Sequence, residues 1–175
     1  RFSDKTGKEE IKYKFNKDNI CNEMQGLDNF EFFDAYANAN KEHIFRKDVK
    51  HLGECKFYIK LDDQYKKNIG KMRMPKMLVC DDRNSILNKG YAGLFMCINS
   101  TGNRELALLE GVSHSDWNAT RHLDATKGRS IMHGIGKFIN ESLNSLKSEI
   151  FKDVSVLEGL EKILGYQDED EDNVN

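Results

Sequence analysis

A long amphipathic segment near the C-terminus constrains the fold more than any other part of this chain. Apolar residues recur there at intervals of three and four, as Ile131, Ile135, Phe138, Ile139, Leu143, Leu146 and Ile150. This spacing places them along one face of an α-helix, and such a face is stable only when another layer covers it. We therefore expect a helix over residues 128–152 that packs against the remainder of the domain.

Two segments show the alternation of apolar and polar residues that is typical of half-buried strands. In residues 53–61, Cys55, Phe57 and Ile59 alternate with charged or polar neighbours. In residues 11–15, three apolar or aromatic residues alternate with lysines. Each segment is predicted to turn one face to the core and the other to solvent.

Three further segments are predicted as strands from apolar or aromatic content alone. Residues 77–80 and 91–98 are continuous apolar runs, as expected of central strands, and residues 81–89 between them indicate a polar hairpin loop. The aromatic run over residues 29–37 is rich in β-prone side chains and is predicted to be a core strand.

The remaining segments carry weaker signals. Residues 38–50 are polar with a short helical tendency. Residues 62–69 are predicted to form a helical turn, because acidic residues begin the segment and lysines end it. Thr101 is expected to cap a helix over residues 104–110, which Gly111 ends.

Together these elements predict an α+β fold, or an α/β two-layer fold, with a four- or five-stranded mixed sheet and helices packed on one face. We expect an N-terminal strand and linker over residues 1–25, one α/β domain over 26–152, and a short helix with an acidic tail over 153–175. The chain does not begin with Met, so we expect it to be a piece of a longer protein.

Composition indicates a reduced, cytoplasmic protein without a membrane span. The formal net charge of −2 gives no general attraction to nucleic acid or to anionic membranes. No apolar run reaches the ~20 residues that a spanning helix needs. The four cysteines are scattered singly and three lie in strand-like runs, which is typical of buried thiols. Their spacing gives no zinc motif, so no metal site is predicted.

The sequence lacks the usual nucleotide and hydrolase signatures, and no cofactor is predicted for this chain itself. One metal-dependent alternative remains. Glu54 and Lys56 form the (D/E)xK half of a nuclease core, and Asp34 at the end of the preceding predicted strand supplies a second carboxylate. Such a set holds Mg²⁺ and activates water. The competing interpretation is a solvated strand face.

Two polar clusters flank the apolar run over 91–98. Lys71, Arg73 and Lys76 stand just before the run over 77–80, where fixed positive charge indicates either a solvated edge or an anion contact. The second cluster gathers six polar or aromatic residues into nine positions, namely His114, Asp116, Trp117, Asn118, Arg121 and His122. Histidine there is compatible with acid–base chemistry. We favour instead a loop fixed by burial of its tryptophan.

Three short blocks occur in an order that resembles a known family. They consist of Met72, Arg73 and Met77; Gly90, Tyr91, Ala92 and Gly93; and Leu108, Leu109, Glu110, His114, Trp117 and Arg121. Over about residues 29–148 the chain resembles the region that follows the ATP-binding domain in bacterial ATPases of the gyrase, heat-shock chaperone, histidine kinase and MutL (GHKL) superfamily. The most similar members are MORC-like proteins of anti-phage and restriction-type loci.

The resemblance implies a transducer domain of the ribosomal-protein-S-five domain-2-like type, which packs against the ATP-binding domain of the same parent chain. In that superfamily a lysine or arginine of this domain reaches the γ-phosphate. Arg73 is the first candidate, followed by Lys71 and Lys76. Pro75 and Lys76 stand where the family has a small residue and glycine. ATP and Mg²⁺ are expected in the parent, along with homodimerisation and nucleic-acid contact through the full-length protein.

The resemblance thus predicts a C-terminal or middle transducer domain that couples the ATP state of an N-terminal domain to conformational change, in phage defence or DNA transactions. The alternatives are the Mg²⁺-dependent nuclease and a protein-interaction domain without nucleotide coupling. This chain is not expected to hold a complete active site.

Overall fold

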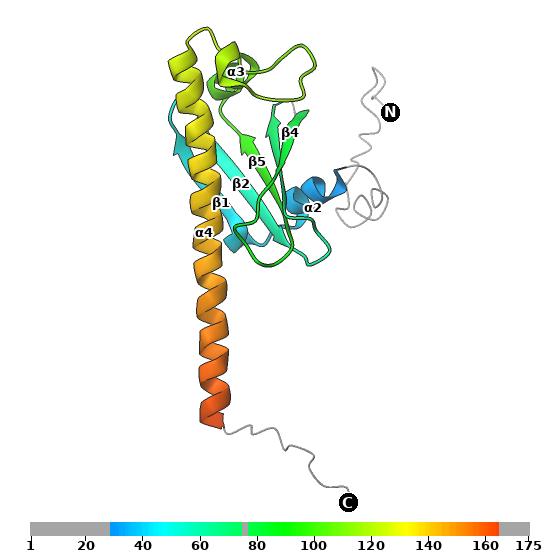
Figure 1. Cartoon of the computed structure of the whole chain (residues 1–175), viewed down its shortest axis with the longest axis vertical. Coiled ribbons are helices and arrows are strands. Elements are labelled where there is room, and N and C mark those ends of the chain that lie inside the picture. The colour runs from blue at the N-terminus through cyan, green and yellow to red at the C-terminus, as the bar shows by residue number, and fades with distance from the viewer. Residues whose placement is uncertain (1–28, 75–76, 165–175) are drawn as a thin grey trace, which may run out of the picture.

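The computed structural model describes residues 29–74 and 77–164 (Figure 1). Its strands form one sheet in the order β1-β2-β5-β3-β4. They are β1 (Ile44–Val49), β2 (Gly53–Leu61), β3 (Asn68–Arg73), β4 (Met77–Arg83) and β5 (Tyr91–Cys97). The helices are α2 (Phe30–Asn38), α3 (Ser100–Ala107) and α4 (Ala125–Leu164), with 3-10 turns at Lys41–His43 and Ala119–Arg121. The predicted α+β class with a mixed sheet is confirmed. The expected strand over residues 11–15 lies outside the described residues.

Strand β5 lies at the centre of the sheet between two strands that precede it in the chain. It pairs antiparallel with β2 and parallel with β3, and all seven of its residues are buried. This position explains the continuous apolar run, because side chains on both faces of a central strand enter a core. The predictions of strands over residues 53–61 and 91–98 are therefore confirmed.

Strand β4 pairs only with β3 and is an edge strand, so the prediction of a central strand over residues 77–80 was wrong. Residues 81–83, expected in a hairpin loop, continue β4, and β4 does not pair with β5. The apolar run has another cause. Leu78 packs with the cluster under α2, whereas Val79 belongs to the cluster under α4. Both faces of this edge strand thus need apolar side chains.

Helix α4 covers the sheet face formed by the odd-numbered residues of β5. The Phe138 ring makes edge-on contacts with Phe57 and Phe95 at centroid distances of 6.4 and 6.3 Å. The predicted helix is confirmed but is longer than expected, because the short amphipathic piece after residue 152 continues it to Leu164. Figure 1 shows the last part of α4 extending past the sheet.

The aromatic segment over residues 29–37 forms helix α2, so the prediction of a strand there was wrong. Phe32 and Ala35, three residues apart, are buried, whereas Phe33 and Tyr36 are exposed. This is the spacing of a helix with one covered face. Helix α2 packs against the opposite face of the sheet from α4, beside Leu94, which the sequence did not indicate.

Three local predictions also need correction. Residues 62–67 form a turn in which the Asp62 carboxylate accepts the Gln64 amide at 3.0 Å, and β3 begins at Asn68. Within residues 38–50, which were expected to have a short helical tendency, Ile44–Val49 form β1, an edge strand whose polar residues obscured the strand pattern. Helix α3 is capped by Asn99 rather than Thr101, through amides at 2.9 and 3.2 Å, and it ends before Gly111.

The space around two glycines gives a test of this packing. A Cβ at Gly102 would lie 2.0 Å from the Leu52 carbonyl oxygen, whereas a Cβ at Gly136 of α4 would meet no atom within 4 Å. We expect Gly102→Ala to lower the free energy of unfolding by about 1–3 kcal/mol through overpacking. The matched Gly136→Ala should raise it by about 0.5–1 kcal/mol, because alanine favours helix. Urea denaturation measures both, and equal effects would contradict the described contact between α3 and the β1–β2 turn.

Candidate functional site

The Glu110 carboxylate joins the end of β3 to the loop that follows α3. Arg73, the last residue of β3, donates to it from Nε and from Nη2, the latter at 2.8 Å from Oε2. The Glu110 side chain is only 1% exposed and that of Arg73 14%. A bidentate arginine–carboxylate pair of this kind fixes both side chains in one geometry.

Two residues of the following loop complete what we name the Glu110 cluster, consisting of Arg73, Glu110, His114 and Trp117. His114 Nδ1 lies 2.8 Å from Oε2, and Trp117 Nε1 donates to Oε1 at 3.2 Å. The Trp117 ring packs edge-on against Phe95 of β5 at 6.3 Å. The loop is therefore fixed by burial of its tryptophan, as favoured from the sequence.

The cluster holds Glu110 as an anion. Burial alone would raise the pKa of this carboxyl group, but hydrogen bonds from Arg73, His114 and Trp117 outweigh burial and leave the pKa below its ordinary value. The same contact raises the pKa of Arg73. Near neutral pH the two side chains form a buried ion pair, which is costly to break because one charge would remain unpaired.

The candidate phosphate-contacting cations have different environments. Arg73 is engaged by Glu110, and its Nη1 donates to the Met74 carbonyl at 3.1 Å. The Lys71 ammonium is paired with Asp82 across the β3–β4 pair. Both positive charges are therefore matched within the domain. Lys76, the third candidate, lies outside the described residues.

The residues of the nuclease alternative do not come together. Asp34 of α2 is buried and accepts hydrogen bonds from Asn38 at 2.6 Å, from Tyr65 and from Lys60. Lys60 and Glu54 are six residues apart on β2, or about 20 Å along the strand. Asp34, beside Lys60, and Glu54 therefore lie near opposite ends of β2.

The pKa of the Asp34 carboxyl group is lowered. Burial opposes this shift, but the hydrogen bonds from its three partners prevail, so Asp34 balances the positive charge of Lys60. Within the described ranges, no group of three or more His, Cys, Asp or Glu side chains is placed to hold a metal ion.

His122 belongs to a separate contact set near the start of α4. The Asp124 amide donates to His122 Nδ1 at 3.0 Å, so that nitrogen carries no proton and Nε2 is left to donate to Glu105 at 2.9 Å. Lys127 also contacts Glu105, at 2.8 Å, and Lys127 and His122 lower the pKa of that carboxyl group. These contacts tie α3 to α4. The two histidines therefore serve different carboxylates and form no common acid–base site.

Neither a protein-family model, nor a curated protein, nor a solved structure matches this chain. The function must accordingly be argued from the geometry and from the order of the sequence blocks. Among the helices that the structure describes, none has the length and apolar character required to cross a bilayer.

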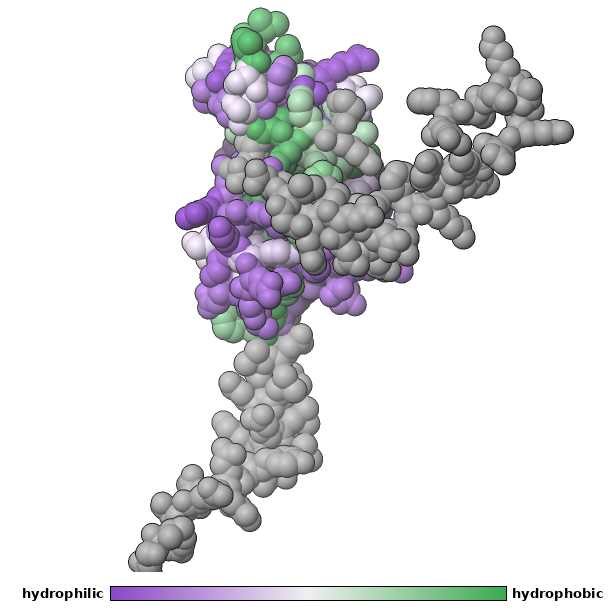
Figure 2. All heavy atoms as spheres, turned by 90° about the vertical axis from the view of Figure 1, so that its right-hand side faces the viewer, coloured by the Kyte–Doolittle hydropathy of each residue, from purple (hydrophilic) through white to green (hydrophobic). Residues whose placement is uncertain are grey.

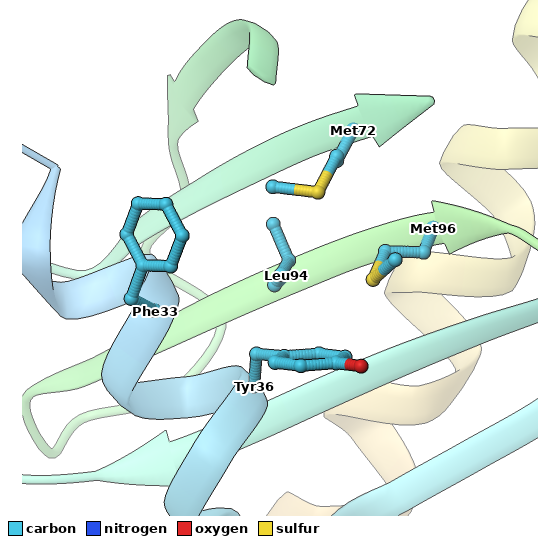
Figure 3. A pocket seen from close by; sticks show the side chains of 5 residues that line it. All are labelled: Phe33, Tyr36, Met72, Leu94 and Met96. Atoms are coloured by element: carbon cyan, nitrogen blue, oxygen red, sulfur yellow. The ribbon is translucent and has the colours of Figure 1, made fainter. Parts of the chain in front are cut away.

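A small apolar groove lies between α2 and the sheet. Figure 3 shows Phe33 and Tyr36 of α2 facing Met72 of β3 and Leu94 and Met96 of β5. Its volume of about 110 Å³ suits one large side chain rather than a nucleotide. Figure 2 shows hydrophobic residues near the end of the domain where α4 begins, while the lower part of this side is mostly hydrophilic, with a small hydrophobic area at its lowest edge.

Sequence reasoning missed the central role of Glu110 and the partners of Asp34. Glu110 was one residue of a matching block, and nothing in its neighbours indicated that it meets Arg73, 37 positions away. Lys60 was taken as a solvated strand residue. In both cases a charged residue lies next to apolar residues in the sequence. Such a pattern indicates that the charge is partly buried, but it does not identify the residue that pairs with it.

The Glu110 cluster predicts that the difference in stability between the unaltered chain and a Glu110→Gln variant depends on pH. At pH 7, Glu110→Gln should lower the free energy of unfolding by about 2–5 kcal/mol, because Arg73 loses its counter-charge. Because the folded-state pKa lies below the ordinary 4.5, this contribution is complete above pH 4.5 and is lost as the pH falls through the lowered value. Urea denaturation at several pH values measures the difference.

The matched control is Glu141→Gln, which removes an exposed pair with Lys47 whose side chains are 43% and 47% exposed. That change should leave the free energy of unfolding nearly unaltered, because solvent screens an exposed pair. Two results would contradict the buried ion pair. One is a loss of stability in Glu110→Gln no larger than that in Glu141→Gln. The other is a stability difference between Glu110→Gln and the unaltered chain that does not become smaller at acid pH.

Proposed function

We propose that this chain is a transducer domain of a bacterial GHKL-type ATPase, which couples the ATP state of a separate ATP-binding domain to conformational change, in phage defence or DNA transactions. The observation that carries the proposal is the Arg73–Glu110 contact. It joins the first and third of the three blocks on which the family resemblance rests. The second block begins β5, which pairs with β3.

The same contacts suggest how the domain presents a cation to its partner. Arg73 is held by Glu110, and the Met74 amide donates to the Asn103 side chain at 2.8 Å. The chain is therefore anchored immediately before residues 75–76. We assign Arg73 as a positioning residue and Lys76, two residues beyond Met74, as the γ-phosphate contact. This reverses the order of candidates expected from the sequence, because the charges of Arg73 and Lys71 are already matched.

A fixed lysine would act on the phosphate by electrostatics alone. It would replace water around the γ-phosphate and stabilise the charge that shifts as the phosphoryl group transfers. ATP and Mg²⁺ would be held by the ATP-binding domain of the parent. The lysine can then transmit nucleotide state only while this domain is docked, which is the physical basis of coupling.

A protein-interaction domain without nucleotide coupling is the second candidate. The apolar groove favours it, because Phe33 and Tyr36 are 44% and 41% exposed beside two methionines. Methionine-lined surfaces adapt to apolar side chains of partners. The transducer proposal is preferred because it also accounts for the proximity of the three sequence blocks in the fold.

ATP turnover in the full-length parent tests the proposal. Lys76→Ala should lower the rate about 10-fold or more, because removing a single charge-stabilising group has effects of that order or larger. Lys89→Ala is the matched control, since Lys89 is exposed in the loop before β5, at the other end of the sheet. An unchanged rate in Lys76→Ala would remove nucleotide coupling and leave the protein-interaction candidate.

Plasmid cleavage tests the nuclease alternative separately. Because Asp34 and Glu54 are apart, incubation with Mg²⁺ should leave supercoiled DNA intact for both the unaltered chain and Glu54→Ala. Agarose electrophoresis gives the result. Cleavage that disappears in Glu54→Ala would instead establish the nuclease and refute the separation of these carboxylates.

A further inference from the structure

Cys55 and Cys97 lie directly opposite each other on the antiparallel strands β2 and β5. The Ile98 amide donates to the Glu54 carbonyl at 2.9 Å, so residues 54 and 98 form a hydrogen-bonded pair. Paired positions alternate along an antiparallel ladder, which makes Cys55 and Cys97 a non-hydrogen-bonded pair with a Cα separation of about 4.5 Å. That separation falls within the range that a disulfide bridges.

Both side chains point into the core under α4 and both are free thiols. Contact with Cys97, together with burial, raises the pKa of the Cys55 thiol. Cys55 is therefore held protonated while the pair is reduced. Cys97 is the residue nearer to the end of its strand and the better placed to react first.

Cys97 lies at the edge of that core, where the backbone of two short segments covers its sulfur atom. Its Sγ lies 3.6 Å from the Leu52 carbonyl oxygen and 3.5 Å from that of Asn99. These atoms belong to the β1–β2 turn and to the cap of α3, two short segments with exposed neighbours such as His51. Separation of the turn from α3 would uncover Cys97 without unpairing the sheet, a sub-global opening of the kind that native proteins undergo.

We propose that Cys55 and Cys97 are a redox modification site, which closes into a cross-strand disulfide by exchange with a small-molecule disulfide such as oxidised glutathione. The Cys97 thiol loses its proton to solvent and its sulfur attacks one glutathione sulfur, expelling a glutathione thiolate. Cys55 then loses its proton and displaces the second glutathione from Cys97. Two electrons pass from the cysteine pair to the small disulfide, and two molecules of reduced glutathione leave.

Closure would covalently join β5 to β2 next to Asn99, the residue that caps α3. The bridge would limit how far the turn that leads into β2 can separate from the α3 cap that follows β5. Oxidation is thus expected to raise the midpoint of thermal unfolding, and dithiothreitol should return it to the value of the reduced chain.

The test treats the whole chain with oxidised glutathione at pH 8. Thiols counted after denaturation should fall from the four of the sequence to two. A non-reduced peptide map should contain a Cys55–Cys97 peptide lighter by two hydrogen atoms than its separate halves. Cys55→Ala is the matched variant, and it should retain one glutathione on Cys97, because the resolving thiol is gone.

The unfolding midpoint of the unaltered chain, before and after oxidation, gives a readout that does not depend on any variant folding. Three outcomes would overturn the proposal. They are the absence of the linked peptide at every glutathione ratio, stable glutathione adducts on both cysteines of the unaltered chain, and thiol loss confined to Cys21 and Cys80.

Discussion

The insertion of β5 between β2 and β3 is the constraint on which the other contacts depend. It gives the sheet two apolar faces, one under α4 and one under α2. Large side chains of the neighbouring strands lie close to β5, so β5 needs a small residue where they approach. A Cβ at Gly93 would lie 2.8 Å from the ring of Phe57, so only glycine lets that ring reach the contact with Phe138. The parallel pairing with β3 also brings Arg73 to the end of the sheet where α3 and its loop follow.

The Glu110 cluster holds the end of β3 and the loop after α3 together at one end of the domain. A buried carboxylate contributes little net stability by itself, because its desolvation offsets most of the attraction. Its effect is on specificity, since arginine, tryptophan and histidine converge on one group with defined directions. The loop after α3 therefore has one conformation relative to β3, and the short chain segment after Met74 starts from a defined position.

Elements with an unbroken period could be predicted from the sequence, and contacts between distant charges could not. Residues 53–61 alternate cleanly because one face of β2 is covered by α4, and α4 shows its stripe because it lies along the sheet. Helix α2 was mistaken for a strand because Phe33 and Tyr36 remain apolar although exposed, which blurs the helical period. Strand β1 was missed because an edge strand with three exposed residues has no apolar run. The Arg73–Glu110 pair depends on topology that no local pattern contains.

The length of α4 makes it a lever arm. It is held at its first turn by Asp124, Lys127 and the contacts of Glu105, and along its middle by the sheet. Its 40 residues correspond to about 60 Å. The part beyond Ile150, the last residue of the helix that the structure describes as packed against the core, is about 20 Å long, so a change of about 5° in the direction of the helix would move Leu164 by roughly 2 Å relative to Ile150. The far end of α4 therefore reports the direction that the sheet imposes on the helix, about 60 Å from the contacts of its first turn.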